Sequence, residues 1–363
     1  MDKFFKNNQL IFVIYCVTVS YGTINLPRII AENAGTGGWI SLILTTVIFL
    51  FIAYIITYLQ YNHSEQTLFE YSSDLLGKPI TYIITIIYIV YFFINFTMIA
   101  RIYAEILKLI FLLKTPTIAI CFLLYLVVFY TLKKDLGTLV RLCTIYGSIN
   151  IIGFILINFS LLSKGKLVNI MPLFNFNDVL IYINTSKKAI ISFAGIEVLL
   201  FIPLSKDKNK KIYKYTLLTM IFIGTLYIFL TEVCISVVGI ESLVYYKATV
   251  FNVIRGLDLY YLEFLRRLDG IYIIFWTMNA FCSICIWGTG TIVFTKKIIP
   301  RIKHTPLLVI TILISFIVSQ LPKTKDRVQD ILEYNGKLGY ITFLVIPLIL
   351  LIAMKVKNND KKA

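Results

Sequence analysis

A glycine and a glutamate lie two residues apart inside an apolar segment of this chain, where each lowers the stability of a membrane helix. In ISFAGIEVLLFIPL (residues 191–204), Gly195 and Glu197 lie near the start and Pro203 near the end. A carboxylate at the centre of a membrane span costs roughly 2.5–3.5 kcal/mol, and glycine costs about 1 kcal/mol relative to alanine. Glycine also lets a ligand approach the backbone closely. The pair therefore indicates an interrupted helix with a polar role.

A second interrupted span is predicted near the N-terminus. VSYGTINLPRII (19–30) carries a mid-span glycine, and Pro27 and Arg28 end the apolar run. Breaking a helix exposes N–H and C=O groups, which can bind the ends of a zwitterionic ligand. The two breaks provide candidate pocket residues: Ser20, Tyr21, Gly22, Thr23, Phe193, Ala194 and Gly195. The alternative is that the glycines only permit close helix packing.

Two other spans carry polar or aromatic side chains at helical spacing. Tyr91 and Asn95 lie one turn apart on the third apolar run, and Asn279, Ser283 and Trp287 recur at i, i+4 and i+8 on the eighth. Tyr91, Asn95, Ser283 and Trp287 are therefore further candidates for the pocket. The alternative for both groups is that they form hydrogen bonds between helices.

Charged side chains inside apolar runs need partners. Glu197 is a candidate pocket residue, or else a structural acceptor for the N–H groups that the broken helices leave free. Glu232 lies within the seventh run and is a functional candidate with no partner identified. Arg101 and Glu105, at i and i+4, are predicted to form a structural ion pair.

The elements that position these residues are predicted to be membrane-spanning helices. The chain has 363 residues, of which 58% are hydrophobic, and a mean hydropathy of +0.83. Lipid satisfies no backbone polar groups, so apolar runs of about 20 residues must be helical. The sequence predicts an all-α polytopic membrane protein with about ten spans, near residues 10–30, 38–59, 80–100, 116–132, 142–162, 187–205, 215–239, 270–295, 306–321 and 338–354.

The basic residues flank these runs. The net charge of +16 is better explained by headgroup contacts than by nucleic-acid binding. Basic clusters at 132–134, 205–214, 295–303 and 355–362 follow even-numbered spans, and therefore lie on one side of the membrane. The positive-inside rule places this side, with both termini, in the cytoplasm.

The two interrupted spans are five spans apart. This spacing divides a single membrane domain (1–363) into two repeats, at approximately 10–162 and 187–354. An odd number of crossings per repeat inverts the second relative to the first. Interrupted helices at matching positions of inverted repeats indicate a secondary-transporter site at the bilayer midplane. We therefore expect a 5+5 inverted-repeat fold in which helices 1 and 6 are broken.

Other kinds of site have little support in the sequence. The six cysteines lie inside apolar runs, and Cys282 and Cys285 form a CxxC spacing without a second such pair or a nearby histidine. They are interpreted as small packing residues, so no metal or other cofactor is expected. No catalytic motif is recognised, which disfavours an enzyme. The four longest polar segments (61–79, 163–186, 240–268 and 322–337) are expected to be loops, the third with a short helix on the outer surface.

Several of these segments resemble known motifs. FAGIE (193–197) resembles the F-x-G-x-E signature of amino acid–polyamine–organocation permeases. A longer resemblance, to the spore germination permeases, is carried by residues 22–28 (GTINLPR), 37–41 (GGWIS), 68–78 (LFEYSSDLLGK), 101–116 (RIYAEILKLIFLLKTP) and 193–204 (FAGIEVLLFIPL). These permeases are the B subunits of nutrient germinant receptors. Ser20 departs from the family, which often has glycine there, and this predicts a more polar pocket floor.

The resemblance implies a leucine-transporter-type fold in the inner membrane of a spore. It also implies that the chain binds a small germinant, such as an amino acid, and assembles with an A-type membrane subunit and a C-type lipoprotein subunit. The alternative function is an active, proton- or ion-coupled amino-acid transporter, since fold alone does not separate the two. The scarcity of charge in the predicted pocket favours a small zwitterionic ligand, and a small sugar or other neutral metabolite is the alternative.

Overall fold

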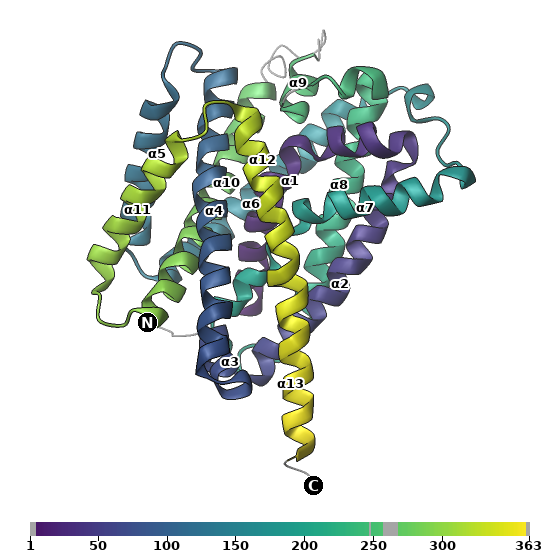
Figure 1. The fold of residues 1–363 in the computed structure, drawn as a ribbon. Helices are drawn as coiled ribbons and strands as arrows, with labels where there is room; N and C mark the ends of the chain where they lie inside the picture. Colours follow the sequence, from purple (N-terminus) through teal and green to yellow (C-terminus); the bar gives the residue numbers. More distant parts are fainter. Residues whose placement is uncertain (1–4, 247, 257–267, 361–363) are drawn as a thin grey trace.

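The computed structural model describes residues 5–246, 248–256 and 268–360, and this part of the chain is helical without strands (Figure 1). The longer helices pack side by side around a buried core. They are α1 (Asn7–Ala34), α2 (Gly38–Asn62), α4 (Lys78–Ile110), α5 (Thr117–Leu132), α6 (Leu136–Leu162), α7 (Val179–Phe193), α8 (Ile212–Leu243), α10 (Leu268–Ile298), α11 (His304–Gln320), α12 (Lys325–Gly339) and α13 (Ile346–Asp360).

All ten apolar runs predicted from the sequence fall on helices. By length and composition, seven helical segments of the described chain can cross a membrane, and one of them, Asn7–Asn62, contains both α1 and α2. Helices α5 and α11 are apolar but shorter, with 16 and 17 residues. The all-α membrane architecture is therefore confirmed, although the length criterion does not count ten separate spans.

Three segments expected to be loops contain helices. Residues 61–79 include α3 (Leu68–Leu76), residues 163–186 include the start of α7, and residues 322–337 form most of α12. Helix α12 has few apolar residues, but they lie on one face, where Val328 and Leu332 are buried. It continues through the π-helix η6 (Tyr340–Val345) into α13. In α3 and α12 the exposed face is mostly polar, so a search for continuous apolar runs overlooks these two helices.

The short helix expected within 240–268 is α9 (Thr249–Arg255), which lies at the upper end of the bundle in Figure 1 and is packed into it. Val250, Phe251 and Val253 are almost fully buried, and α9 packs against α1 and α10. The prediction for residues 257–267 lies outside the described part of the chain.

The first span bends where it was expected to break. Helix α1 is helical from Asn7 to Ala34 with Pro27 inside it, and in Figure 1 its first half follows the bundle while its second half lies across the upper end. Helices α8 and α10 hold the bend. Their side chains donate hydrogen bonds to three α1 carbonyls: Ser283 to Val17, Tyr227 to Thr18 and Trp276 to Ser20. The prediction of a broken first helix is thus wrong in detail, because side chains stabilise a kink without ending the helix.

The sixth span is interrupted as predicted. Helix α7 ends at Phe193, Ala194 is extended, and the chain resumes as the 3₁₀ helix η4 (Ile196–Phe201). Gly195 has φ of +149°, a conformation that side chains with a Cβ rarely adopt. A Cβ there would also lie 2.4 Å from Thr18 Oγ1 on α1. Glycine is therefore required both by the backbone and by the contact with α1.

The lower end of the bundle in Figure 1, where α1 begins and α13 ends, is tied together by polar contacts. Lys297 of α10 forms an ion pair with Glu70 of α3. Partial burial by itself raises the pKa of Glu70, but hydrogen bonds from Lys297 and Thr67 lower it on balance. Asn209, in the loop after η4, donates hydrogen bonds to the Phe5 carbonyl and to Asn7. These contacts connect the start of α1 to the chain that follows the interruption.

Substitution of Arg101 tests how strongly the polar contacts between α4 and α11 stabilise the bundle. Its guanidinium contacts Glu105 at 2.8 Å, and it also donates to the Ser319 carbonyl and to Gln320 on α11. We expect Arg101→Met to lower the free energy of unfolding by up to about 3–5 kcal/mol, because the Glu105 carboxylate, whose side chain is only 18% exposed, loses its partner. Thermal unfolding of the purified protein in detergent measures this.

The matched control is Arg327→Met. Arg327 and Asp330 form an ion pair with side chains 76% and 53% exposed, and the loss of such a pair changes stability by at most about 1 kcal/mol. Equal effects of the two substitutions would show that the Arg101 network does not stabilise the bundle.

Candidate ligand-binding site

Glu197 organises the interruption between α7 and η4. The side chain is completely buried, and each carboxylate oxygen accepts one hydrogen bond. Oε2 lies 2.8 Å from the backbone nitrogen of Gly195, and Oε1 lies 2.7 Å from the hydroxyl oxygen of Tyr91 on α4. Glu197 thus satisfies an N–H group that the interruption leaves free, and fixes the interruption against α4.

A small internal cavity of about 30 Å³ lies beside this interruption. That volume admits a water or two, and is far below the 300–1,000 Å³ of ordinary ligand pockets. The cavity is enclosed by residues from α1, α4, α7, α10, α12 and η6. The lining residues are Val17, Thr18, Tyr21, Tyr91, Asn95, Ile99, Ile191, Ala194, Trp287, Leu332, Gly336 and Phe343.

Three polar groups of the lining have no hydrogen-bond partner among the described residues. They are the Thr18 hydroxyl on α1, the Asn95 amide nitrogen on α4 and the Trp287 indole nitrogen on α10. Buried polar groups are ordinarily paired. All three can donate a hydrogen bond, so the cavity is suited to an acceptor such as a carboxylate oxygen.

Of the pocket residues predicted from the sequence, five line this cavity: Tyr21, Tyr91, Asn95, Ala194 and Trp287. Gly195 and Glu197 do not line the cavity, but their hydrogen bonds hold the interruption beside it in place. The Trp287 ring packs edge-on against Tyr91, with centroids 5.8 Å apart. The structure thus brings together residues from both predicted interruptions and from spans three and eight.

The other predicted pocket residues serve packing. Ser20 and Thr23 donate hydrogen bonds to carbonyls of their own helix, and the Ser283 hydroxyl donates to the Val17 carbonyl. Phe193 packs against the Tyr227 ring, with centroids 5.0 Å apart. Gly22 leaves room for the same tyrosine, because a Cβ there would lie 2.0 Å from its hydroxyl oxygen. The close-packing alternative therefore describes Gly22 better than ligand contact does.

Sequence reasoning missed the contribution of α12 and η6. Leu332 and Gly336 of α12 and Phe343 of η6 line the cavity. Residues 322–337 were expected to be a loop, so none of their side chains was considered. The apolar spacing of Val328 and Leu332, one helical turn apart and both buried, is the signal that identifies the inward face of α12.

A larger chamber of about 500 Å³ lies next to the small cavity. The two share Tyr21 and Ile191 as lining residues. The chamber is bounded by the second half of α1, by α7 and by α12, which meet at the upper end in Figure 1. Its walls carry charges of both signs: Arg28, Glu32, Lys187, Lys188, Glu333 and Lys337. Its volume falls in the range of ligand pockets.

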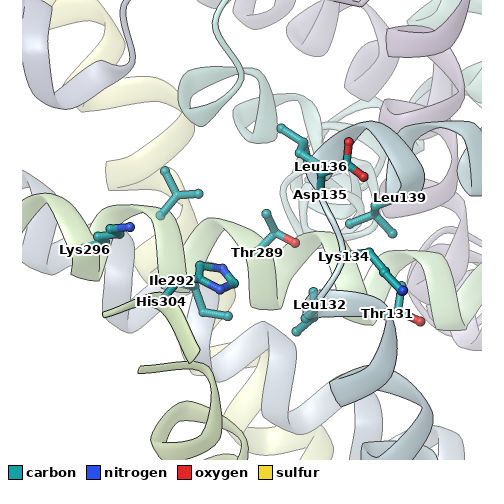
Figure 2. A pocket seen from close by; sticks show the side chains of 11 residues that line it. Thr131, Leu132, Lys134, Asp135, Leu136, Leu139, Thr289, Ile292, Lys296 and His304 are labelled. Atoms are coloured by element: carbon teal, nitrogen blue, oxygen red, sulfur yellow. The ribbon is translucent and has the colours of Figure 1, made fainter. Parts of the chain in front are cut away.

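Toward the lower end, aromatic rings are packed together below the small cavity. Phe92 lies 5.9 Å from Phe201 and 5.7 Å from Phe294 between ring centroids. A separate cavity of about 180 Å³ lies between the ends of α5, α6, α10 and α11 (Figure 2). None of the predicted pocket residues lines it, so it is distinct from the candidate site.

Comparison with known proteins identifies the family of this chain. Residues 5–328 match the spore germination protein family. The chain belongs to this family. It is 29% identical to spore germination protein A2 of Bacillus subtilis, covering 97% of this chain and 95% of that protein. It is 23% identical to spore germination protein GerLB of Bacillus cereus, covering 99% and 96%.

A solved structure supports the fold. This member of the spore germination family matches a Na⁺-coupled sialic acid symporter with a TM-score of 0.67, over 93% of this chain and 76% of the symporter, at 13% sequence identity. At this identity the similarity shows the fold alone, which is the leucine-transporter type predicted from the sequence.

Substitutions at Glu197 separate an architectural role from a charged or proton-carrying one. We expect Glu197→Gln to leave membrane abundance and germinant response close to normal, because the amide oxygen can accept from Gly195 while its N–H₂ donates to Tyr91. Glu197→Leu leaves two buried donors unpaired at about 1–3 kcal/mol each, so we expect it to lower abundance strongly. Immunoblots of membrane fractions and germination assays measure both properties.

Tyr91→Phe is the matched control, because it removes one of the two hydrogen bonds and should have an intermediate effect on abundance. A Glu197→Gln protein with full abundance and no response would show that the charge or the proton is required.

Proposed function

We propose that this protein is the nutrient-binding subunit of a spore germination receptor, and that its ligand binds beside the α7–η4 interruption. The observation that carries the proposal is the set of unpaired donors on Thr18, Asn95 and Trp287, which face one cavity. Membership of the spore germination family supports the physiological role. The transporter fold supports the position of the site, because ligands of such folds bind at the midplane between interrupted helices.

The chemistry of the cavity favours a small ligand with an acceptor group. The three unpaired groups are donors, whereas the nearby Glu197 carboxylate has both oxygens engaged. A carboxylate oxygen of an amino acid would satisfy the donors, and the apolar side chains of Ile99, Leu332 and Phe343 would contact the remainder. A small sugar or another neutral metabolite is the alternative ligand.

Binding requires the site to enlarge. The cavity of about 30 Å³ is too small for an amino acid, whereas the adjacent chamber of about 500 Å³ is large enough. We propose that the ligand enters through this chamber, and that movement of Tyr21 and Ile191, which line both spaces, joins them. The lower end of the bundle stays closed during this step, because its aromatic rings remain packed and its polar contacts remain formed.

The proposal includes an assembly and an orientation. The receptor would contain an A-type membrane subunit and a C-type lipoprotein subunit beside this chain. It would lie in the spore inner membrane with both termini in the cytoplasm, consistent with α1 beginning and α13 ending at the same end of the bundle (Figure 1). Purification of the receptor from spores with a tag on this chain identifies the subunits.

The second candidate function is active amino-acid transport, which the fold favours equally. The two functions differ in the fate of the ligand. Robust uptake of a labelled amino acid into vesicles that contain this protein alone would favour transport. Ligand binding without accumulation would favour the receptor function.

Trp287→Phe tests the site. It retains an aromatic ring against Tyr91 but removes the indole N–H, which has no hydrogen-bond partner in the described part of the chain. We expect the germinant concentration for half-maximal response to rise about tenfold or more, at unchanged protein abundance, because a buried hydrogen bond to a charged acceptor contributes about 1.5–3 kcal/mol. Dose–response curves with intact spores measure the shift.

Trp276→Phe is the matched control. Its indole N–H donates to the Ser20 carbonyl at the bend of α1, so its loss should lower abundance more than it shifts the dose response. An unchanged dose response in Trp287→Phe would refute the assignment of this cavity as the germinant site.

A further inference from the structure

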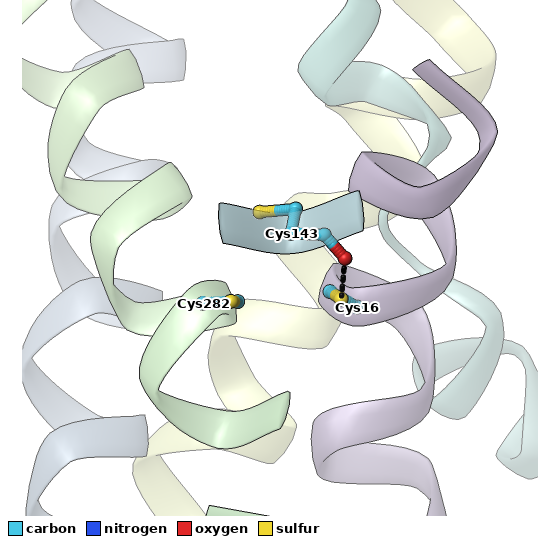
Figure 3. Close-up of side chains that lie close together, drawn as sticks. All are labelled: Cys16, Cys143 and Cys282. Atoms are coloured by element: carbon cyan, nitrogen blue, oxygen red, sulfur yellow. Dashed lines mark hydrogen bonds between the residues drawn. The ribbon is translucent and has the colours of Figure 1, made fainter. Parts of the chain in front are cut away.

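Three cysteines from three different helices meet in the interior of the protein. Cys16 of α1, Cys143 of α6 and Cys282 of α10 are fully buried, and their sulfur atoms all lie within 4.8 Å of one another (Figure 3). The Cys16 thiol donates a hydrogen bond to the Cys143 carbonyl, with the sulfur 3.6 Å from the oxygen. All three are present as free thiols.

From this arrangement we propose that the three thiols form a binding site for a soft, thiophilic metal ion, with copper(I) as the best match. Metal–sulfur bonds of about 2.3 Å in a trigonal plane place the sulfurs about 4 Å apart. The observed separations reach this geometry with shifts of less than about 1 Å. Thiolate ligands select copper(I) and zinc among the available cations.

Copper(I) fits better than zinc because of the number of ligands. Structural zinc is almost always four-coordinate, and the cluster contains three sulfurs. Three sulfurs match the trigonal coordination of copper(I) and leave zinc one ligand short. The bound cysteines are thiolates, so metal binding releases the thiol protons and weakens as the pH falls.

The cluster lies close to the bend of α1 and to the small cavity. Cys16 lies two residues before Thr18 of the cavity, and Cys282 immediately precedes Ser283, which donates a hydrogen bond to the Val17 carbonyl. Helix α6 packs closely on α1 one turn from Cys143, where a Cβ on Gly147 would lie 3.2 Å from the Cys16 sulfur. A metal bound here would link α1 to α6 and α10 next to the bend.

The test uses the purified full-length protein in detergent, kept reduced, with copper(I) supplied from a bicinchoninate complex. We expect one copper per chain, three sulfur neighbours in X-ray absorption spectra, and a higher midpoint of thermal unfolding. Cys16→Ala, Cys143→Ala and Cys282→Ala should each weaken copper binding by at least about 100-fold, since even residues that only orient metal ligands contribute 10–100-fold.

Cys121→Ala and Cys234→Ala are the matched controls, because both cysteines are fully buried but lie outside the cluster. They should bind copper like the unmodified protein. Equal copper binding by the triple alanine variant would indicate an adventitious ion only and would overturn the proposal. If the cluster variants do not fold, fewer than three sulfur neighbours in the spectra of the unmodified protein would overturn it as well.

Discussion

The hydrogen bonds of Glu197 are the constraint on which the centre of this protein depends. A membrane interior offers no water to backbone groups, so an interrupted helix is stable only where other groups satisfy it. One carboxylate oxygen accepts from the Gly195 N–H of the interruption, and the other accepts from the Tyr91 hydroxyl of α4. This places the interruption against α4 and next to the cavity. Glu197 and Gly195 therefore stabilise the interruption together, and neither residue alone accounts for it.

The α7–η4 interruption and the bend of α1 are stabilised by different hydrogen bonds. The α7–η4 span loses helical hydrogen bonds at Ala194 and Gly195 and is completed by a carboxylate. Helix α1 stays helical, and its bend is stabilised by donors from Ser283, Tyr227 and Trp276. Because these side chains belong to α8 and α10, any movement of α1 is coupled to both helices. The proposed entry of a ligand and the proposed metal cluster act on the same group of helices.

The cavity volumes show which parts of the interior are open and which are closed. The chamber at the upper end is of ligand size, while the space beside the interruption holds only a water or two. Toward the lower end, the Phe92, Phe201 and Phe294 rings and the Glu70–Lys297 ion pair close the bundle. The structure thus has a wide upper chamber, a contracted central site and a closed lower end. The proposed binding of a ligand at the central site would require free energy to separate α1, α7 and α12.

The sequence by itself determined the membrane class, the long apolar helices and the interruption at Gly195, because lipid requires long apolar helices and penalises a mid-span carboxylate without a partner. It also identified Tyr91, Asn95 and Trp287 through their helical spacing. Only the tertiary structure decided that Gly22 makes room for Tyr227, that α12 completes the cavity, and that Cys16 and Cys143 approach Cys282. These outcomes depend on contacts between helices far apart in the chain. Local periodicity describes the faces of a helix, whereas the neighbour of each face is set by the packing of the whole bundle.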